Sequence, residues 1–95
     1  MVLELSRIIE TSTHGAAQLG EQLLKLQRNH ERVVGVKFLP TKLSTGHFVV
    51  KVAVKLNGKS TMTEDQARQW FAHKTTSWLN GYAVFELEEV QCSEL

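Results

Sequence analysis

Hydrophobic and polar residues follow two different periods along the chain, and the change of period marks its elements. Between residues 16 and 29, apolar residues recur every three or four positions, which places them on one face of a helix. The stretch Thr11 to Gly15 contains poor helix formers and two good N-cap residues, Ser12 and Thr13. We therefore expect a break in this stretch and a helix from about Ala16 to Asn29.

The segment before this break, Val2 to Glu10, has two interpretations. Val2, Leu5 and Ile8 or Ile9 have helical spacing, whereas Leu3, Leu5 and Ile9 lie at alternating positions that suit a strand. The helical interpretation is preferred, and the strand remains the alternative.

The clearest pattern lies in the middle of the chain. From His47 to Leu56, apolar residues occupy every second position without interruption, which predicts a strand with one buried face. An earlier alternation over Val34 to Phe38 predicts a strand that ends at Pro40. The dipeptide Asn57-Gly58 favours a hairpin turn, so a short strand over Lys59 to Met62 is expected to follow.

A second helix and a last strand complete the pattern. Thr63 and Gln66 have the spacing of a capping box, and Asn80-Gly81 is typical of a helix exit. The last strand is expected over Tyr82 to about Val90. Its inward-facing residues are expected to be Ala83, Phe85 and Leu87.

These elements predict a single α+β domain over residues 1–95, with a mainly antiparallel sheet of three or four strands and two or three helices on one face. The order is αββαβ if residues 2–10 are helical. It is βαββαβ, a ferredoxin-like order, if they form a strand. The apolar runs are far shorter than the roughly 20 residues that span a bilayer, so no membrane-spanning segment is expected.

Charge is unevenly distributed although the net charge is only +1. The segment from Lys25 to Lys59 holds eight basic residues and one acidic residue, whereas Glu86 to Leu95 holds four acidic residues. One interpretation is a cationic surface that contacts a partner protein or nucleic acid. Its expected members are Lys25, Arg28, Arg32, Lys37, Lys42, His47, Lys51, Lys55 and Lys59. In the competing interpretation, Lys51 and Lys55 face Glu86 and Glu88 across the sheet and are neutralised.

Reactive residue types form no recognisable constellation. The four histidines are scattered, no phosphate-binding loop is present, and Glu86 and Glu88 are expected side by side on a solvated strand face. We therefore expect no catalytic residue, no cofactor, no metal and no small-molecule ligand. The single cysteine, Cys92, has no partner for an internal disulfide, which favours a cytoplasmic location.

The sequence thus favours a non-enzymatic interaction module, a small regulatory or accessory protein that binds another protein. The bound protein can be a second copy of the chain, which gives a homodimer. This is expected because the N-terminal segment has more apolar residues than one side of a short element buries. The residues expected at that subunit interface are Val2, Leu3, Leu5, Ile8 and Ile9. Nucleic-acid binding through residues 25–59 is the alternative function.

Overall fold

The first element of the chain is a strand, and the preferred helical interpretation of this segment is wrong. In the computed structural model, which describes residues 2–57 and 62–95, Val2–Thr11 forms strand β1 with strictly alternating burial. Arg7 occupies one of the buried positions. A charged residue at an inward position interrupts the period-two apolar pattern, which makes the alternation hard to recognise in the sequence.

Helix α1 follows directly and spans Thr13–Asn29. The Ser12 side chain accepts a hydrogen bond from the Gly15 backbone N–H, which caps the first turn. The expected break between the first segment and this helix is therefore the end of β1. Leu19, Leu23 and Leu26 lie on the buried face of the helix, as their spacing predicted.

Strands β2 and β3 form an antiparallel pair in the middle of the chain. β2 spans Val33–Lys42 and β3 spans Phe48–Asn57. The uninterrupted period-two pattern of β3 produces a buried strand face, on which Val50, Val52 and Val54 are fully buried. The expected Asn57-Gly58 turn and the short strand over Lys59 to Met62 depend on residues 58–61, which lie outside the described residues.

Helix α2 spans Glu64–Trp78 and carries the expected capping box. The Thr63 hydroxyl accepts from the Gln66 backbone N–H, and the Gln66 side chain accepts from the Thr63 backbone N–H. Gly81, with a φ of 92°, lies after the helix in the left-handed region that favours glycine. The chain then enters the last strand.

Strand β4 spans Val84–Glu94 and pairs with β1 at the edge of the sheet. Two register shifts interrupt this pairing, so Glu88 lies opposite Ile8 while Glu86 lies opposite Ile9. Such β-bulges change which side chains face the core. The expected inward orientation of Ala83, Phe85 and Leu87 is wrong, because all three are exposed.

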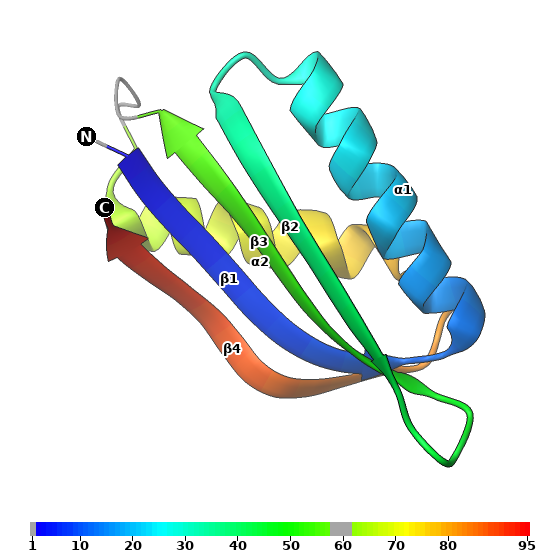
Figure 1. The fold of residues 1–95 in the computed structure, drawn as a ribbon. Coiled ribbons are helices and arrows are strands. Elements are labelled where there is room, and N and C mark those ends of the chain that lie inside the picture. Colours follow the sequence, from blue (N-terminus) through cyan, green and yellow to red (C-terminus); the bar gives the residue numbers. More distant parts are fainter. Residues whose placement is uncertain (1, 58–61) are drawn as a thin grey trace.

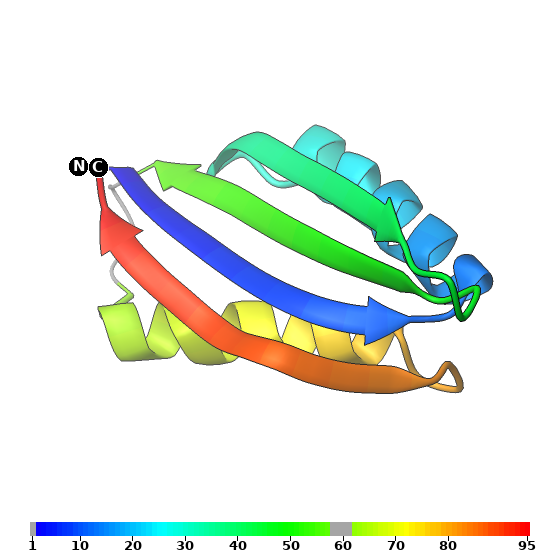
Figure 2. The same cartoon turned by 60° about the horizontal axis from the view of Figure 1, so that its bottom comes forward.

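The strand order across the sheet is β2-β3-β1-β4, and all three pairings are antiparallel. Both helices lie on one side of the sheet (Figure 1), and the hydrophobic core lies between that side and the helices. The α+β class is confirmed, with the element order βαββαβ. Figure 2 shows the strands side by side with both helices behind them, so no helix or strand among the described residues covers the other side of the sheet. Within the described residues, no helix is both long and apolar enough to cross a membrane.

Candidate functional site

The side of the sheet that neither described helix covers is called the open face here. Side chains alternate between the two sides of each strand, so the strand registers identify the residues that point outward. Its members are Glu4, Ser6, Ile8 and Glu10 on β1; Lys37, Leu39 and Thr41 on β2; Val49, Lys51, Ala53 and Lys55 on β3; and Phe85, Glu88, Gln91 and Ser93 on β4.

Apolar side chains form a diagonal band across the open face, in which each lies beside a charged residue of a neighbouring strand. Leu39 on β2 is 56% exposed and Phe85 on β4 is 55% exposed. Ile8 and Val49, on the two central strands, lie between them and are partly exposed. Leu87, which is 53% exposed, lies at the bulge between Glu86 and Glu88. The chain therefore leaves these apolar side chains at least partly exposed to water.

His47 holds one end of this band in position. Its ring stacks on Phe85 with centroids 6.5 Å apart, and its Nδ1 lies 3.0 Å from Oε2 of Glu10. His47 immediately precedes β3, Glu10 lies on β1 and Phe85 lies on β4, and β1 lies between the other two strands in the sheet. Phe85 is thus presented to solvent in an orientation that a histidine contact and a carboxylate support.

Charge divides the sheet by strand. β2 and β3 contain four lysines and no acidic residue, whereas β1 and β4 contain six glutamates and a single basic residue, Arg7, which points inward. On the open face this places three cations on one half and three anions on the other. The cations are Lys37, Lys51 and Lys55, and the anions are Glu4, Glu10 and Glu88.

Half of these six charges have a partner within the chain. Lys37 Nζ lies 3.8 Å from Oε2 of Glu4, and Glu10 is paired with His47. Lys51, Lys55 and Glu88 form no ion pair with any residue that the structure describes. The expected pairing of Lys51 and Lys55 with Glu86 and Glu88 does not form, because β1 lies between β3 and β4.

The expected cationic surface is distributed over different sides of the molecule. Lys37, Lys51 and Lys55 lie on the open face, whereas Lys25 and Arg28 belong to α1 on the opposite side of the sheet. Lys25 forms an ion pair with Glu21 at 3.2 Å. Of the remaining members, His47 contacts Phe85, Arg32 follows α1, Lys42 ends β2, and Lys59 lies outside the described residues.

The five residues expected at a subunit interface are also divided between the two sides of the sheet. Leu3, Leu5 and Ile9 are at most 2% exposed and belong to the core of this chain. They cannot contact a partner while the domain is folded. Val2 and Ile8 are partly exposed and point to the other side. Only these two are available for contact, and Ile8 lies within the apolar band.

A buried polar network on the helix side was missed by sequence reasoning. The Arg7 guanidinium, 6% exposed, donates to Glu86 Oε2 at 2.6 and 3.1 Å and to Thr75 Oγ1 at 2.7 Å. Its Nη1 also donates to Thr76 Oγ1 at 3.0 Å. The network ties β1 to α2 and β4. The only signal in the sequence was a charged residue at an inward position of an alternating segment.

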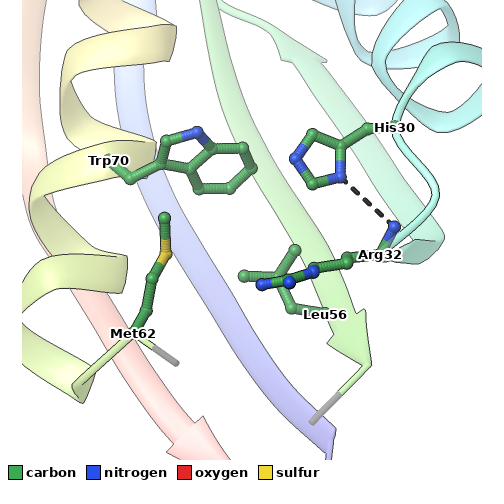
Figure 3. Close-up of a pocket in the computed structure, with 5 residues that line it drawn as sticks. All are labelled: His30, Arg32, Leu56, Met62 and Trp70. Carbon is green, nitrogen blue, oxygen red and sulfur yellow. Dashed lines mark hydrogen bonds between the residues drawn. The ribbon is translucent and has the colours of Figure 1, made fainter. Parts of the chain in front are cut away.

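Two hollows lie on the helix side of the sheet. The first, of about 120 Å³, is lined by His30, Arg32, Leu56, Met62 and Trp70 (Figure 3). The Trp70 and His30 rings have centroids 5.5 Å apart and planes tilted by 55°, and the Arg32 backbone N–H donates to His30 Nδ1 at 3.3 Å. This volume suits a group of about the size of one side chain, since a cavity of roughly 150 Å³ holds benzene.

The second hollow, of about 290 Å³, lies between α2 and β4. Its lining is polar and of mixed charge, and consists of Arg68, Gln69, Ala72, Glu86, Glu89 and Val90. Glu86 is already held by Arg7. Among the residues that the structure describes, no three His, Cys, Asp or Glu side chains converge to hold a metal ion.

Comparison with known proteins adds no relative from which a function could be transferred. No model of a protein family matches the chain, and no curated protein matches it.

Proposed function

We propose that this protein is a non-enzymatic interaction module that binds another protein through the open face of its sheet, in a regulatory or accessory role. The observation that carries the proposal is the apolar band from Leu39 to Phe85, whose two ends are each more than half exposed. Single apolar side chains are normal on a protein surface, whereas several that are diagonal neighbours across a sheet, with charged residues between and around them, are a candidate interaction site. We place this function in the cytoplasm, in keeping with a single unpaired cysteine.

The chemistry of the open face supports a protein as the occupant better than a nucleic acid. A sheet that binds RNA uses a positive surface and aromatic side chains on its central strands to stack bases. The only aromatic ring among the open-face residues is Phe85, on an edge strand, and its face is stacked by His47. Glu4, Glu10 and Glu88 would repel phosphates.

The proposal is tested by affinity purification of the tagged chain from its native host, with and without nuclease. Leu39→Asp and Phe85→Asp each place a charge in the apolar band. Leu24→Asp is the matched control, because Leu24 is 57% exposed and lies on α1, away from the open face. Circular dichroism establishes that each variant is folded.

We expect the wild type and Leu24→Asp to retain the same partner, and both open-face variants to lose it. Equal retention by all four proteins would place the binding surface elsewhere and overturn the proposal. Loss of the bound material after nuclease treatment would favour the nucleic-acid alternative instead.

A further inference from the structure

We infer that the protein bound by the open face is a second copy of this chain, with β2 of each copy lying over β4 of the other. This inference rests on the proposed function and names its partner. The observation that carries it is the division of charge by strand, because a face with cations on one half and anions on the other is complementary to itself.

The charge pattern selects one of two symmetric arrangements. Two copies of a chain pack most often about a twofold axis, which makes the same patch contact itself. If the axis runs parallel to the strands, the lysine half formed by β2 and β3 lies over the glutamate half formed by β1 and β4. If the axis runs across the strands, lysines lie over lysines and glutamates over glutamates. Only the first arrangement places opposite charges together.

This arrangement gives partners to Lys51, Lys55 and Glu88, which form no ion pair with the described residues of the single chain, and Glu4 and Glu10 keep their contacts with Lys37 and His47. Lys55 lies opposite Glu4 in the strand register, so a half-turn about the central axis stacks it over Glu4 of the second copy. Lys51 lies opposite Ile8, and it reaches toward Glu10 and Glu88 of the second copy, on either side of that isoleucine. Packed sheets are about 10 Å apart, a distance that extended lysine and glutamate side chains together can bridge.

The same rotation brings the apolar edges of the two copies near each other. Leu39 on one edge strand comes to lie over Glu88 on β4 of the second copy, one row of the sheet away from Phe85. Ile8 and Val49 lie near the axis, where the half-turn places them over Lys51 and Glu10 of the second copy, with their own counterparts on the adjacent strand. The contact at each edge thus joins β2 of one copy, which contributes Leu39, to β4 of the other copy, which contributes Phe85.

The area of the face agrees with a reversible dimer. Each strand has about ten residues, so the face measures roughly 33 Å by 19 Å, or about 600 Å² per copy. The total of about 1,200 Å² is at the lower end of specific, stable interfaces. We therefore expect association in the micromolar range, with faster dissociation at high salt because charge contributes to the contact.

Sedimentation velocity over roughly 1 to 500 µM tests the inference directly. We expect the wild type to change from monomer to dimer across this range. Lys51→Glu and Glu88→Lys each place like charges together, and each is expected to raise the dissociation constant by about tenfold or more. Lys74→Glu and Glu21→Lys make the same changes of charge on α2 and α1 and are expected to leave it unchanged.

Mixing the Lys51→Glu and Glu88→Lys chains is the decisive step. In an equal mixture, the glutamate introduced by the first substitution meets the lysine introduced by the second. The unchanged Lys51 and Glu88 meet in the symmetry-related contact. We expect the mixture to dimerise more tightly than either variant alone. A mixture that stays as weak as its components would overturn the arrangement, as would open-face variants that dimerise like the helix controls.

A measurement without substitutions covers the case in which a variant does not fold. In NMR spectra of the wild type, dilution is expected to shift the amide signals of Leu39 and Phe85 and to leave that of Leu24 unchanged. A wild type that is monomeric at every concentration would overturn the inference. The proposed function would still stand if the tagged chain retained a different protein through the open face, and both would fall if it retained none.

Discussion

Arg7 and Glu86 form an ion pair between the central strand and the edge strand, with two guanidinium nitrogens of Arg7 donating to the same carboxylate oxygen of Glu86. The Arg7 side chain is 7% exposed and the Glu86 side chain is 46% exposed. The remaining donors of Arg7 reach Thr75, Thr76 and the Ala72 carbonyl on α2. A buried cation is thereby surrounded by acceptors from two elements, which fixes α2 against β1 and β4.

Substitution of Glu86 by alanine should destabilise the fold. The change leaves Arg7 with neutral acceptors only, and an uncompensated buried charge is costly. Because Glu86 is nearly half exposed, water can replace part of the lost contact, and we expect the free energy of unfolding to fall by about 1–2 kcal/mol. Urea denaturation followed by circular dichroism measures the change.

Glu88 provides the matched control, since it lies two residues away on the same strand, faces the open side and forms no ion pair with the described residues. Glu88→Ala should change the free energy of unfolding by less than about 0.5 kcal/mol. Equal effects of the two substitutions would contradict a stabilising role for the Arg7–Glu86 pair.

Gly15 is required by the close approach of α1 to the end of β1. A Cβ atom at this position would overlap with Oγ1 of Thr11, which donates a hydrogen bond to the Ala83 carbonyl at 2.7 Å. Gly15→Ala should therefore lower the free energy of unfolding by about 1–3 kcal/mol, although alanine is the better helix former. Thermal and urea denaturation measure this directly.

Gly35 is the control, because a Cβ atom there meets only the end of the Lys55 side chain at 3.8 Å. Gly35→Ala should be close to neutral. The double variant with Thr11→Ala and Gly15→Ala removes the overlapping hydroxyl, and it should be more stable than the sum of the two single effects predicts. Strict additivity would show that Gly15 acts through something other than Thr11.

The two phenylalanines Phe71 and Phe85 should differ sharply in their contribution to folding. Phe71 is fully buried between α2 and the sheet, whereas Phe85 is 55% exposed. Phe71→Ala should cost about 3–5 kcal/mol, the range for a large side chain removed from a core. Phe85→Ala should cost under about 1 kcal/mol when unfolding is measured at low micromolar concentration, where the chain is expected to be monomeric. A large cost for Phe85 would contradict its assignment to the open face.

The sequence predicted those elements whose signals are local. The capping box at Thr63 and Gln66 and the unbroken alternation of β3 depend on residues close together in the chain, and both are confirmed. Ser12 was one of two expected caps for α1, and the structure selects it. A helix cap depends on hydrogen bonds between residues near in sequence, and a strand is recognised by the alternation of its apolar residues. Both can be predicted without knowledge of the tertiary structure.

The errors arose where orientation depends on a distant partner. Arg7 made strand β1 hard to recognise in the sequence. A charged side chain is tolerated at this inward position because Glu86, Thr75 and Thr76, which are distant in the chain, accept its hydrogen bonds. Which β4 side chains point to the core depends on two bulges, and these arise in the pairing of β4 with β1. Strand order also explains the failed charge pairing. Lys51 and Lys55 on β3 were expected to face Glu86 and Glu88 on β4, but the neighbour of β3 on that side is β1. The charge division of the open face follows from strand order and could not be read from the uneven charge along the chain.

Cys92 should be a slow nucleophile despite its place on an edge strand. Burial raises the pKa of the Cys92 thiol, Glu64 raises it further, and Arg68 acts in the opposite direction. A raised pKa means a smaller thiolate fraction at pH 8, and the thiolate is the reactive form. Alkylation by iodoacetamide at pH 8 should therefore be slower in the folded protein than in the urea-unfolded chain.

The pH dependence separates this electrostatic effect from simple shielding. Shielding lowers the rate at every pH, whereas a raised pKa moves the midpoint of the rate profile to higher pH. Removing the negative charge with Glu64→Gln should lower the midpoint, and removing the positive charge with Arg68→Gln should raise it. Glu21→Gln, on the other helix, should leave it unchanged. A folded-state midpoint at or below that of the unfolded chain would contradict the burial of this thiol between β4 and the start of α2.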